Sequence, residues 1–154
     1  MKSSFSRRLP LLILLPLLAL AVVPFAVAAD ADPISARQDE MEGVGDSMKA
    51  LSGIAKKQTP FDAAVVKQHG EAIAAHLAKA KDLFPAGSDK GGMETWAKPE
   101  IWTNRADFDA KLQAGHDAAL ELSKVEQEAA FGAALGKLGN TCKGCHESFR
   151  RPKG

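Results

Sequence analysis

Apolar residues recur every three or four positions along most of the chain after residue 32, which is the spacing of one face of an α-helix. Asp32-Pro33 offers an N-cap followed by Pro at the first helical position, so a first helix is predicted from there to about Lys57. Thr59-Pro60 is expected to separate it from a second helix, which Pro85 ends. The inward positions of these two helices are Ile34, Met41, Val44, Met48, Leu51 and Ala55, then Val66, Gly70, Ile73, Leu77, Ala80 and Phe84.

The second half of the chain repeats the helical pattern after a loop. Residues 85–99 hold two Pro and three Gly, so they are predicted to form a loop long enough to have a function. A third helix is expected over 104–122, and Ser123-Lys124-Val125-Glu126 has the form of a capping box that starts a fourth. The fold class is therefore predicted as all-α, an antiparallel up-down-up-down four-helix bundle. Its later inward positions are Phe108, Leu112, Gly115, Ala119 and Leu122, then Phe131, Leu135, Leu138, Cys142, Cys145 and Phe149.

The first 29 residues have a different pattern, typical of a secretory signal. Three basic residues precede an apolar run over 9–23, and residues 26–28 read Ala-Val-Ala, a small-x-small cleavage site. We therefore predict a cleaved signal over 1–29, a single domain over 30–154 and export to the periplasm. An uncleaved membrane anchor is the alternative, because residues 9–29 could just span a bilayer; three Pro within or beside them count against it.

Charge and cysteine content exclude other classes. Residues 30–154 carry 17 basic and 19 acidic side chains, which argues against a nucleic-acid binder that works by bulk electrostatics. With two Cys in the whole chain, at positions 142 and 145, a disulfide framework is excluded as well.

Those two Cys belong to the one motif whose spacing specifies a chemistry. Cys142-Lys143-Gly144-Cys145-His146 is the C-x-x-C-H signature of covalent haem attachment, in which two thiols add to the haem vinyl groups and the His binds iron. Residues three apart on a helix face the same way, so both sulfurs can reach one edge of the porphyrin. The motif predicts one haem c per chain, enclosed by the bundle, with His146 as proximal axial ligand.

Two other uses of the Cys pair are weaker. A redox dithiol needs C-x-x-C at the start of a helix, typically after a strand, and here the pair lies in the last turns of the last helix. A zinc site would need further ligands, and the adjacent Cys145 and His146 fit one tetrahedron poorly.

Across residues 30–154 the sequence resembles the class II cytochromes c, the group that contains cytochrome c′ and its low-spin relatives. The resemblance lies in Arg37-Gln38 followed by Met41 and Met48, in Phe84-Pro85 and Pro99-Glu100-Ile101-Trp102 at the two ends of the loop, and in the haem motif followed by Phe149-Arg150. It implies the four-helix bundle and haem contacts from Arg37, Gln38, Glu94 and Thr95. For Arg37 there is also a physical argument: an Arg on an apolar helix face needs an anion, and a haem propionate would supply one.

Met41 lies one turn after Arg37 on the inward stripe and is predicted as the distal axial ligand. In the low-spin relatives a Met at this place binds iron, whereas in cytochrome c′ an apolar residue covers an open site that takes nitric oxide or carbon monoxide. Residues 41–48, with Met first, Gly at 45 and Met at 48, resemble the low-spin type. A core-filling role for Met41 is the alternative.

The sequence thus predicts a periplasmic monohaem c-type cytochrome that carries single electrons and is not an enzyme. Its partners are expected to be periplasmic or membrane-bound redox proteins, with no nucleic acid. The alternative function is a five-coordinate haem protein that binds nitric oxide or carbon monoxide, and a more remote one is a thiol–disulfide protein. A homodimer stays open, since some relatives pair through their first two helices. A basic cluster that could attract an acidic partner comprises Lys137, Lys143, Arg150, Arg151 and Lys153.

Overall fold

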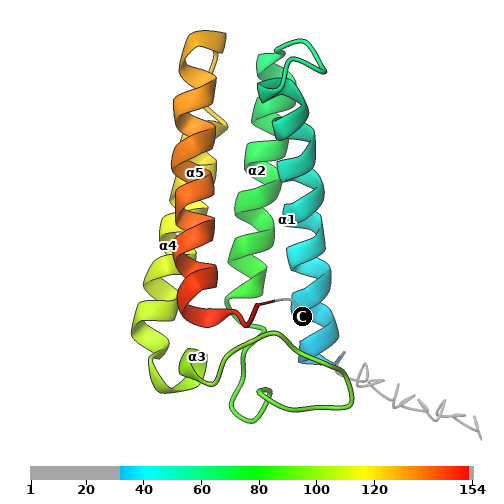
Figure 1. The fold of residues 1–154 in the computed structure, drawn as a ribbon, viewed down its shortest axis with the longest axis vertical. Coiled ribbons are helices and arrows are strands. Elements are labelled where there is room, and N and C mark those ends of the chain that lie inside the picture. Colours follow the sequence, from blue (N-terminus) through cyan, green and yellow to red (C-terminus); the bar gives the residue numbers. More distant parts are fainter. Residues whose placement is uncertain (1–31, 153–154) are drawn as a thin grey trace, which may run out of the picture.

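Four long helices lie side by side with sequence neighbours antiparallel (Figure 1), so the computed structural model, which describes residues 32–152, confirms the predicted bundle. The predicted signal over 1–29 lies outside the described residues. Within 32–152, no helix combines the length and the apolar character that crossing a membrane requires. The helices are α1 (Pro33–Ala55), α2 (Ala63–Ala80), the short α3 (Glu100–Thr103), α4 (Arg105–Leu122) and α5 (Glu128–Phe149).

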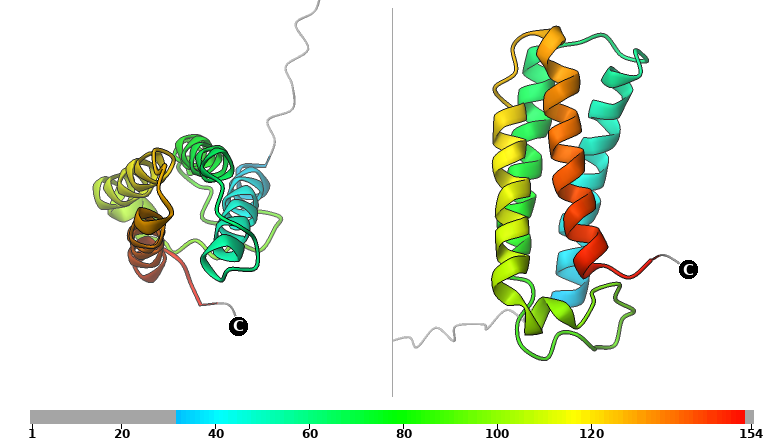
Figure 2. Two further views of the ribbon diagram at one scale, coloured as in Figure 1. Left: turned by 90° about the horizontal axis from the view of Figure 1, so that it is seen from above. Right: turned by 60° about the vertical axis from the view of Figure 1, so that its left-hand side comes forward.

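The helices do not pack equally on one another. α1 packs along α2, α2 along α4 and α4 along α5, whereas α1 and α5 touch only slightly. The view from above shows the four helices as a ring (Figure 2). The start of α1, the end of α5 and the loop over 81–99 lie at the same end of the bundle (Figure 1). Direct helix contact closes the ring least between α1 and α5.

The boundary between α1 and α2 is set by Asp62 and not by Thr59-Pro60. The Asp62 carboxylate accepts hydrogen bonds from the N–H groups of Ala64 and Val65, at 2.8 and 3.4 Å, so α2 begins three residues later than predicted. An Asp with extended backbone satisfies the free N–H groups of a helix start, which Pro60 cannot do. At the start of α1, the predicted cap is confirmed, because the Asp32 carboxylate accepts from the Ile34 N–H at 3.0 Å.

The capping box predicted at Ser123 is wrong. Ser123 keeps a helical backbone at the end of α4: its N–H donates to the Ala119 carbonyl and its hydroxyl donates to the Leu120 carbonyl. An N-cap needs a non-helical backbone. Gln127, with φ −115° and ψ 129°, has one, so α5 begins at Glu128.

The second helix also ends earlier than predicted, at Ala80 instead of Pro85. Tight turns close it, because the N–H groups of Asp82 and Leu83 donate to the carbonyls of Lys79 and Ala80 at 3.2 and 3.1 Å. Just beyond the helix, the Arg105 guanidinium, from α4, donates to the carbonyls of Lys81 and Phe84 at 2.9 and 3.1 Å. The chain then runs as a loop to α3. The sequence pattern did not predict this short helix. The Trp102 indole N–H, on α3, donates to the Pro85 carbonyl at 2.8 Å and closes this end of the bundle.

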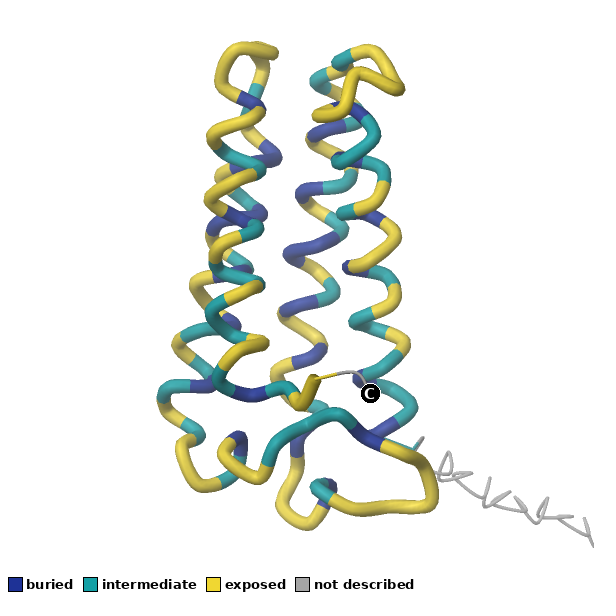
Figure 3. Tube along the Cα trace, in the orientation of Figure 1, coloured by how far each residue is buried: buried dark blue, intermediate teal, exposed yellow. Residues whose placement is uncertain are grey.

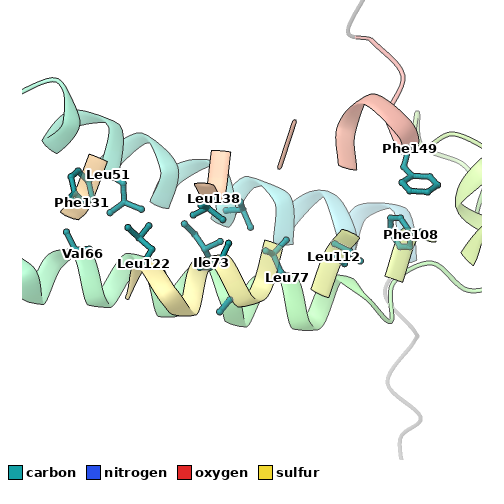
Figure 4. Close-up of a cluster of buried hydrophobic side chains, with 14 of the residues drawn as sticks. Leu51, Val66, Ile73, Leu77, Phe108, Leu112, Leu122, Phe131, Leu138 and Phe149 are labelled. Carbon is teal, nitrogen blue, oxygen red and sulfur yellow. The ribbon is translucent and has the colours of Figure 1, made fainter. Parts of the chain in front are cut away.

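Buried residues form one continuous strip along the inner faces of the helices (Figure 3), but its character changes along the bundle. The middle and far end are mainly aliphatic, whereas aromatic rings gather at the loop end (Figure 4). There Phe108 meets Phe84 and Phe149 edge to face, with ring centroids 4.7 and 5.3 Å apart. The fully buried aliphatic residues include Leu51, Val66, Ile73, Leu122 and Leu138.

The contact between α2 and α4 depends on Gly70. A β-carbon there would lie 2.8 Å from Ser123 Cβ and 2.9 Å from the Ala119 carbonyl oxygen, and the backbone cannot yield. We expect Gly70→Ala to lower the free energy of unfolding by about 1–2 kcal/mol, an overpacking cost partly offset by the better helix propensity of Ala. Denaturant unfolding measures it, with Gly136→Ala on α5 as control, because a β-carbon there meets nothing within 4 Å. Equal effects of the two changes would contradict the close contact.

Candidate functional site

A cavity of about 620 Å³ lies at the loop end of the bundle, and residues from α1 and α5 are among those that line it. This volume is within the usual range for small-molecule and cofactor sites. Side chains from α2, α3 and α4 complete the wall together with the loop. The apolar part of the wall includes Leu77, Phe84, Ile101, Phe108, Leu112 and Phe149.

The predicted haem-attachment residues all line this cavity from α5. Cys142 and Cys145 are free thiols, one turn apart and partly buried. Burial raises the pKa of Cys145 to about 11 and raises the pKa of Cys142 as well. Both thiols are therefore neutral near pH 7, unlike the attacking Cys of a redox dithiol, whose pKa is lowered.

His146 follows Cys145 on the same wall. Partial burial lowers the pKa of its imidazole, and the positive charge of Arg150 lowers it further. Neutral imidazole is the form that binds a metal ion, so the surroundings of His146 favour its role as a ligand.

Met41 lines the cavity from α1, the helix on the other side. Among the methionines in residues 32–152, Met41 is the one that lines the cavity; Met48 packs against the hydrophobic core and Met93 is exposed. The structure thus brings Met41 and His146 to one cavity from positions more than one hundred residues apart.

Arg37 is buried beside Met41, with 4% of its surface exposed, and its hydrogen-bond partners belong to the loop. Its guanidinium donates to the Ser88 hydroxyl and carbonyl, at 3.1 and 2.8 Å, and to the Thr95 hydroxyl at 2.8 Å. Burial lowers the pKa of Arg37. The guanidinium also stacks on the rings of Phe84 and Trp102. The guanidinium of Arg37 therefore donates its hydrogen bonds to neutral oxygens of the loop, and its contact with a haem propionate stays a prediction.

Of the other three residues predicted to contact haem, two line the cavity and one does not. Gln38 and Thr95 line the cavity. Glu94 does not: its side chain is exposed, and its carbonyl accepts a hydrogen bond from the Gln38 amide at 2.8 Å. The loop turns the Glu94 side chain outward, and its backbone oxygen binds Gln38, so the haem contact of Glu94 stays a prediction.

Sequence reasoning missed several residues of the wall. Trp96 and Ala97 come from the loop, where the backbone pairs with the end of α5: the Lys98 N–H donates to the Phe149 carbonyl, and the Arg151 N–H donates to the Trp96 carbonyl, at 3.0 and 2.7 Å. No local sequence pattern marks such a long-range pairing. The remaining missed residues are Glu42, Lys111 and Thr141.

Comparison with known proteins identifies the family. The model of the family described as Cytochrome C′ matches residues 32–150, which is most of the chain. The chain belongs to the cytochrome c′ family. It is 42% identical to a cytochrome c′ of Pararhodospirillum photometricum over 117 residues, which cover 74% of this chain and 92% of the relative. It is 37% identical to cytochrome c-556 of Agrobacterium fabrum over 125 residues, which cover 80% and 84%.

Solved structures of the family have the same fold. Cytochrome c′ from Rhodopseudomonas palustris superposes with a TM-score of 0.75 at 34% identity, over 80% of this chain and 99% of that one. A nitric oxide complex of a mutant cytochrome c′ from Alcaligenes xylosoxidans superposes with a TM-score of 0.70 at 30% identity, over 79% and 95%.

A cytochrome c′ carries covalently bound haem c, and the cavity of this family member fits that group. Two neutral thiols one turn apart, an adjacent neutral imidazole and an aromatic wall form a donor set and an enclosure of the required chemistry. The alternatives of a redox dithiol and a zinc site have no such support from the family.

Proposed function

We propose that this cytochrome is a periplasmic one-electron carrier, not an enzyme, with one haem c per chain and with His146 and Met41 as axial ligands. The observation that carries the proposal is the position of Met41, which lines the same cavity as the C-x-x-C-H motif from another helix. The resemblance of residues 41–48 to the low-spin, Met-ligated members of the family adds support.

Each residue of the site has a separate task in this proposal. When bound, haem c supplies an iron that changes by one electron between the ferric and ferrous states. Cys142 and Cys145 would hold the group by two thioether bonds, and the His146 imidazole would bind its iron. The Met41 thioether would supply a second ligand from α1 and would favour the ferrous state. The apolar and aromatic wall would shield the group from water.

The first test replaces the distal residue. We expect Met41→Ala to convert a low-spin protein to a high-spin one, to lower the reduction potential and to speed carbon monoxide binding. The free energy of unfolding should fall by about 2 kcal/mol or less, because Met41 is only partly buried. Optical and EPR spectra, potentiometry and carbon monoxide kinetics measure these changes.

Met48→Ala is the matched control for that experiment. Met48 lies two turns further along α1, partly buried against the core and outside the cavity. Met48→Ala should leave the spin state and the reduction potential unchanged and should lower the free energy of unfolding by a similar amount. A Met41→Ala protein with the spectrum of the wild type would contradict the ligand assignment.

The second candidate function is binding of nitric oxide or carbon monoxide at a five-coordinate iron. What favours it is the similarity to a family member solved as a nitric oxide complex. Under this alternative Met41 only packs against the distal face. A high-spin wild-type protein that binds gas rapidly would support it over electron transfer.

A basic hollow of about 510 Å³ beside His146 suggests where a redox partner docks. Lys98, Lys143, Arg150 and Arg151 line it, with Glu147 as the single acid. Lys98 was missed in the predicted cluster, whereas Lys137 lies elsewhere and pairs with Glu121. Lys153 lies outside the described residues. We propose that an acidic surface of the partner docks over this hollow, next to the proximal ligand.

Charge reversal tests the docking surface. We expect Lys143→Glu to slow oxidation of the ferrous protein by the anionic oxidant ferricyanide by about two- to tenfold at low salt, and the difference should shrink as salt rises. Stopped-flow kinetics measure the rates. Lys124→Glu, also an exposed lysine but at the far end of the bundle, is the control. Equal slowing by both variants would show that net charge, and not this hollow, sets the rate.

A further inference from the structure

The contact between α1 and α2 next to Met41 is unusually close. At Gly43 a β-carbon would lie 2.4 Å from Nε2 and 2.5 Å from Cε1 of His76, so the imidazole of His76 rests directly on the backbone of α1. Any side chain at position 43 would push that ring away. His76 belongs to α2 and does not line the cavity.

The ring of His76 is also held by a hydrogen bond. His76 Nδ1 and Glu40 Oε2 are 2.6 Å apart, and both side chains are largely shielded, with 30% and 19% of their surfaces exposed. Lys79 Nζ lies 3.8 Å from the other oxygen of Glu40 and keeps that carboxylate on the α2 side. The contact between Glu40 and His76 therefore fixes the position of Glu40, on α1, relative to α2.

The fixed point lies immediately before Met41. Successive residues of an α-helix are rotated by about 100°, so the direction of Glu40 sets the direction of Met41. Glu40 and Gly43 turn toward α2, while Arg37, Met41 and Val44 turn toward the cavity. Because α1 scarcely touches α5, its rotation at this level is set by the contacts with α2 together with the hydrogen bonds of Arg37 to the loop one turn earlier.

We propose that Glu40, Gly43 and His76 are positioning residues that hold α1 in the rotation at which the Met41 sulfur reaches the distal face of the site. This inference rests on the proposed ligation by Met41. A partly exposed hydrogen bond contributes little to global stability. Its geometric effect is larger, because a site must be held to about half an ångström to function.

The experiment uses the haem-loaded protein and variants of the contact. Gly43→Ala displaces the ring, and His76→Phe keeps a ring but removes the hydrogen bond. His76→Gln retains a side-chain N–H that can donate to Glu40 and serves as the conservative rescue. His116→Phe is the matched control, because its Nδ1 lies 3.0 Å from Asp117 on its own helix and joins no two helices. EPR spin state, carbon monoxide association rate and thermal unfolding are measured for each.

We expect Gly43→Ala and His76→Phe to raise the high-spin fraction and to speed carbon monoxide association about tenfold or more, since a displacement of about one ångström has effects of this order or larger. His76→Gln should lie close to the wild type, and His116→Phe should equal it. If Gly43→Ala fails to incorporate haem, Glu40→Ala carries the same expectation, because it removes the partner of His76 and of Lys79 without adding a side chain between α1 and α2.

Two negative results are distinct. If the wild type is low-spin and the variants keep its spin state and gas kinetics while unfolding earlier, the contact is merely structural and the inference is wrong. If the wild type itself is high-spin, ligation by Met41 is wrong. Met41 then only covers the distal face, and an unchanged association rate in Gly43→Ala overturns the positioning role as well.

Discussion

Replacing both Cys142 and Cys145 with Ser should abolish covalent attachment of haem. A Ser hydroxyl does not form the bond that each thiol makes, so His146 and Met41 would be left to hold the group without a covalent link. We expect acidified acetone to extract all haem from the double variant and none from the wild type. Mass spectrometry of the denatured chains should show the mass of one haem on the wild type alone.

Replacing one Cys at a time should reduce haem attachment without abolishing it. Cys142→Ser or Cys145→Ser leaves one thioether, so haem should stay with the denatured chain in reduced yield. Thr141→Ala, which changes a neighbouring residue of the same wall, should retain full attachment. Covalent haem on the double variant would show that another residue forms the bond.

Arg37→Ala should cause the largest loss of stability. It removes a buried guanidinium and leaves the hydroxyls of Ser88 and Thr95 and the Ser88 carbonyl without their donor. We expect the free energy of unfolding to fall by about 3 kcal/mol or more, the scale for breaking a buried, charge-assisted network. Denaturant unfolding of the haem-loaded protein measures the loss.

The loop itself gives a second readout of the same change. Lys90 is exposed in the segment that Arg37 holds, so trypsin should cut there faster in Arg37→Ala than in the wild type. Lys49→Ala, an exposed replacement on α1, is the control and should change neither property. A stability loss no greater than that of Lys49→Ala would contradict the anchoring of the loop.

The elements that could be predicted are those whose signal is local in the sequence. The three–four spacing of apolar residues predicted the four long helices, because burial on one helical face imposes that period. The C-x-x-C-H motif is contiguous, so its residues needed no knowledge of the fold to be placed together. The inward position of Met41 followed from the same spacing, whereas its predicted role as a ligand came from the family resemblance.

What escaped prediction depends on partners far away in the chain. The segment after α2 is held by Arg105 of α4, and Arg37 hydrogen-bonds to a loop about fifty residues later. Ser123 has the right residue type for an N-cap, yet the chain continues as helix through it. The approach of His76 to Gly43 likewise appears only when α1 and α2 are packed together. The spacing of apolar residues shows which face of a helix is buried, but it does not show which residues of other elements that face contacts.

The spectrum of the wild-type protein tests the central claim most directly. The ferric form is examined by optical absorption and EPR, and the ferrous form is then exposed to carbon monoxide. Ligation by His146 and Met41 predicts low-spin iron in both oxidation states and slow, weak carbon monoxide binding, because the gas must displace a sulfur held by α1. High-spin ferric iron and rapid binding of the gas would contradict it.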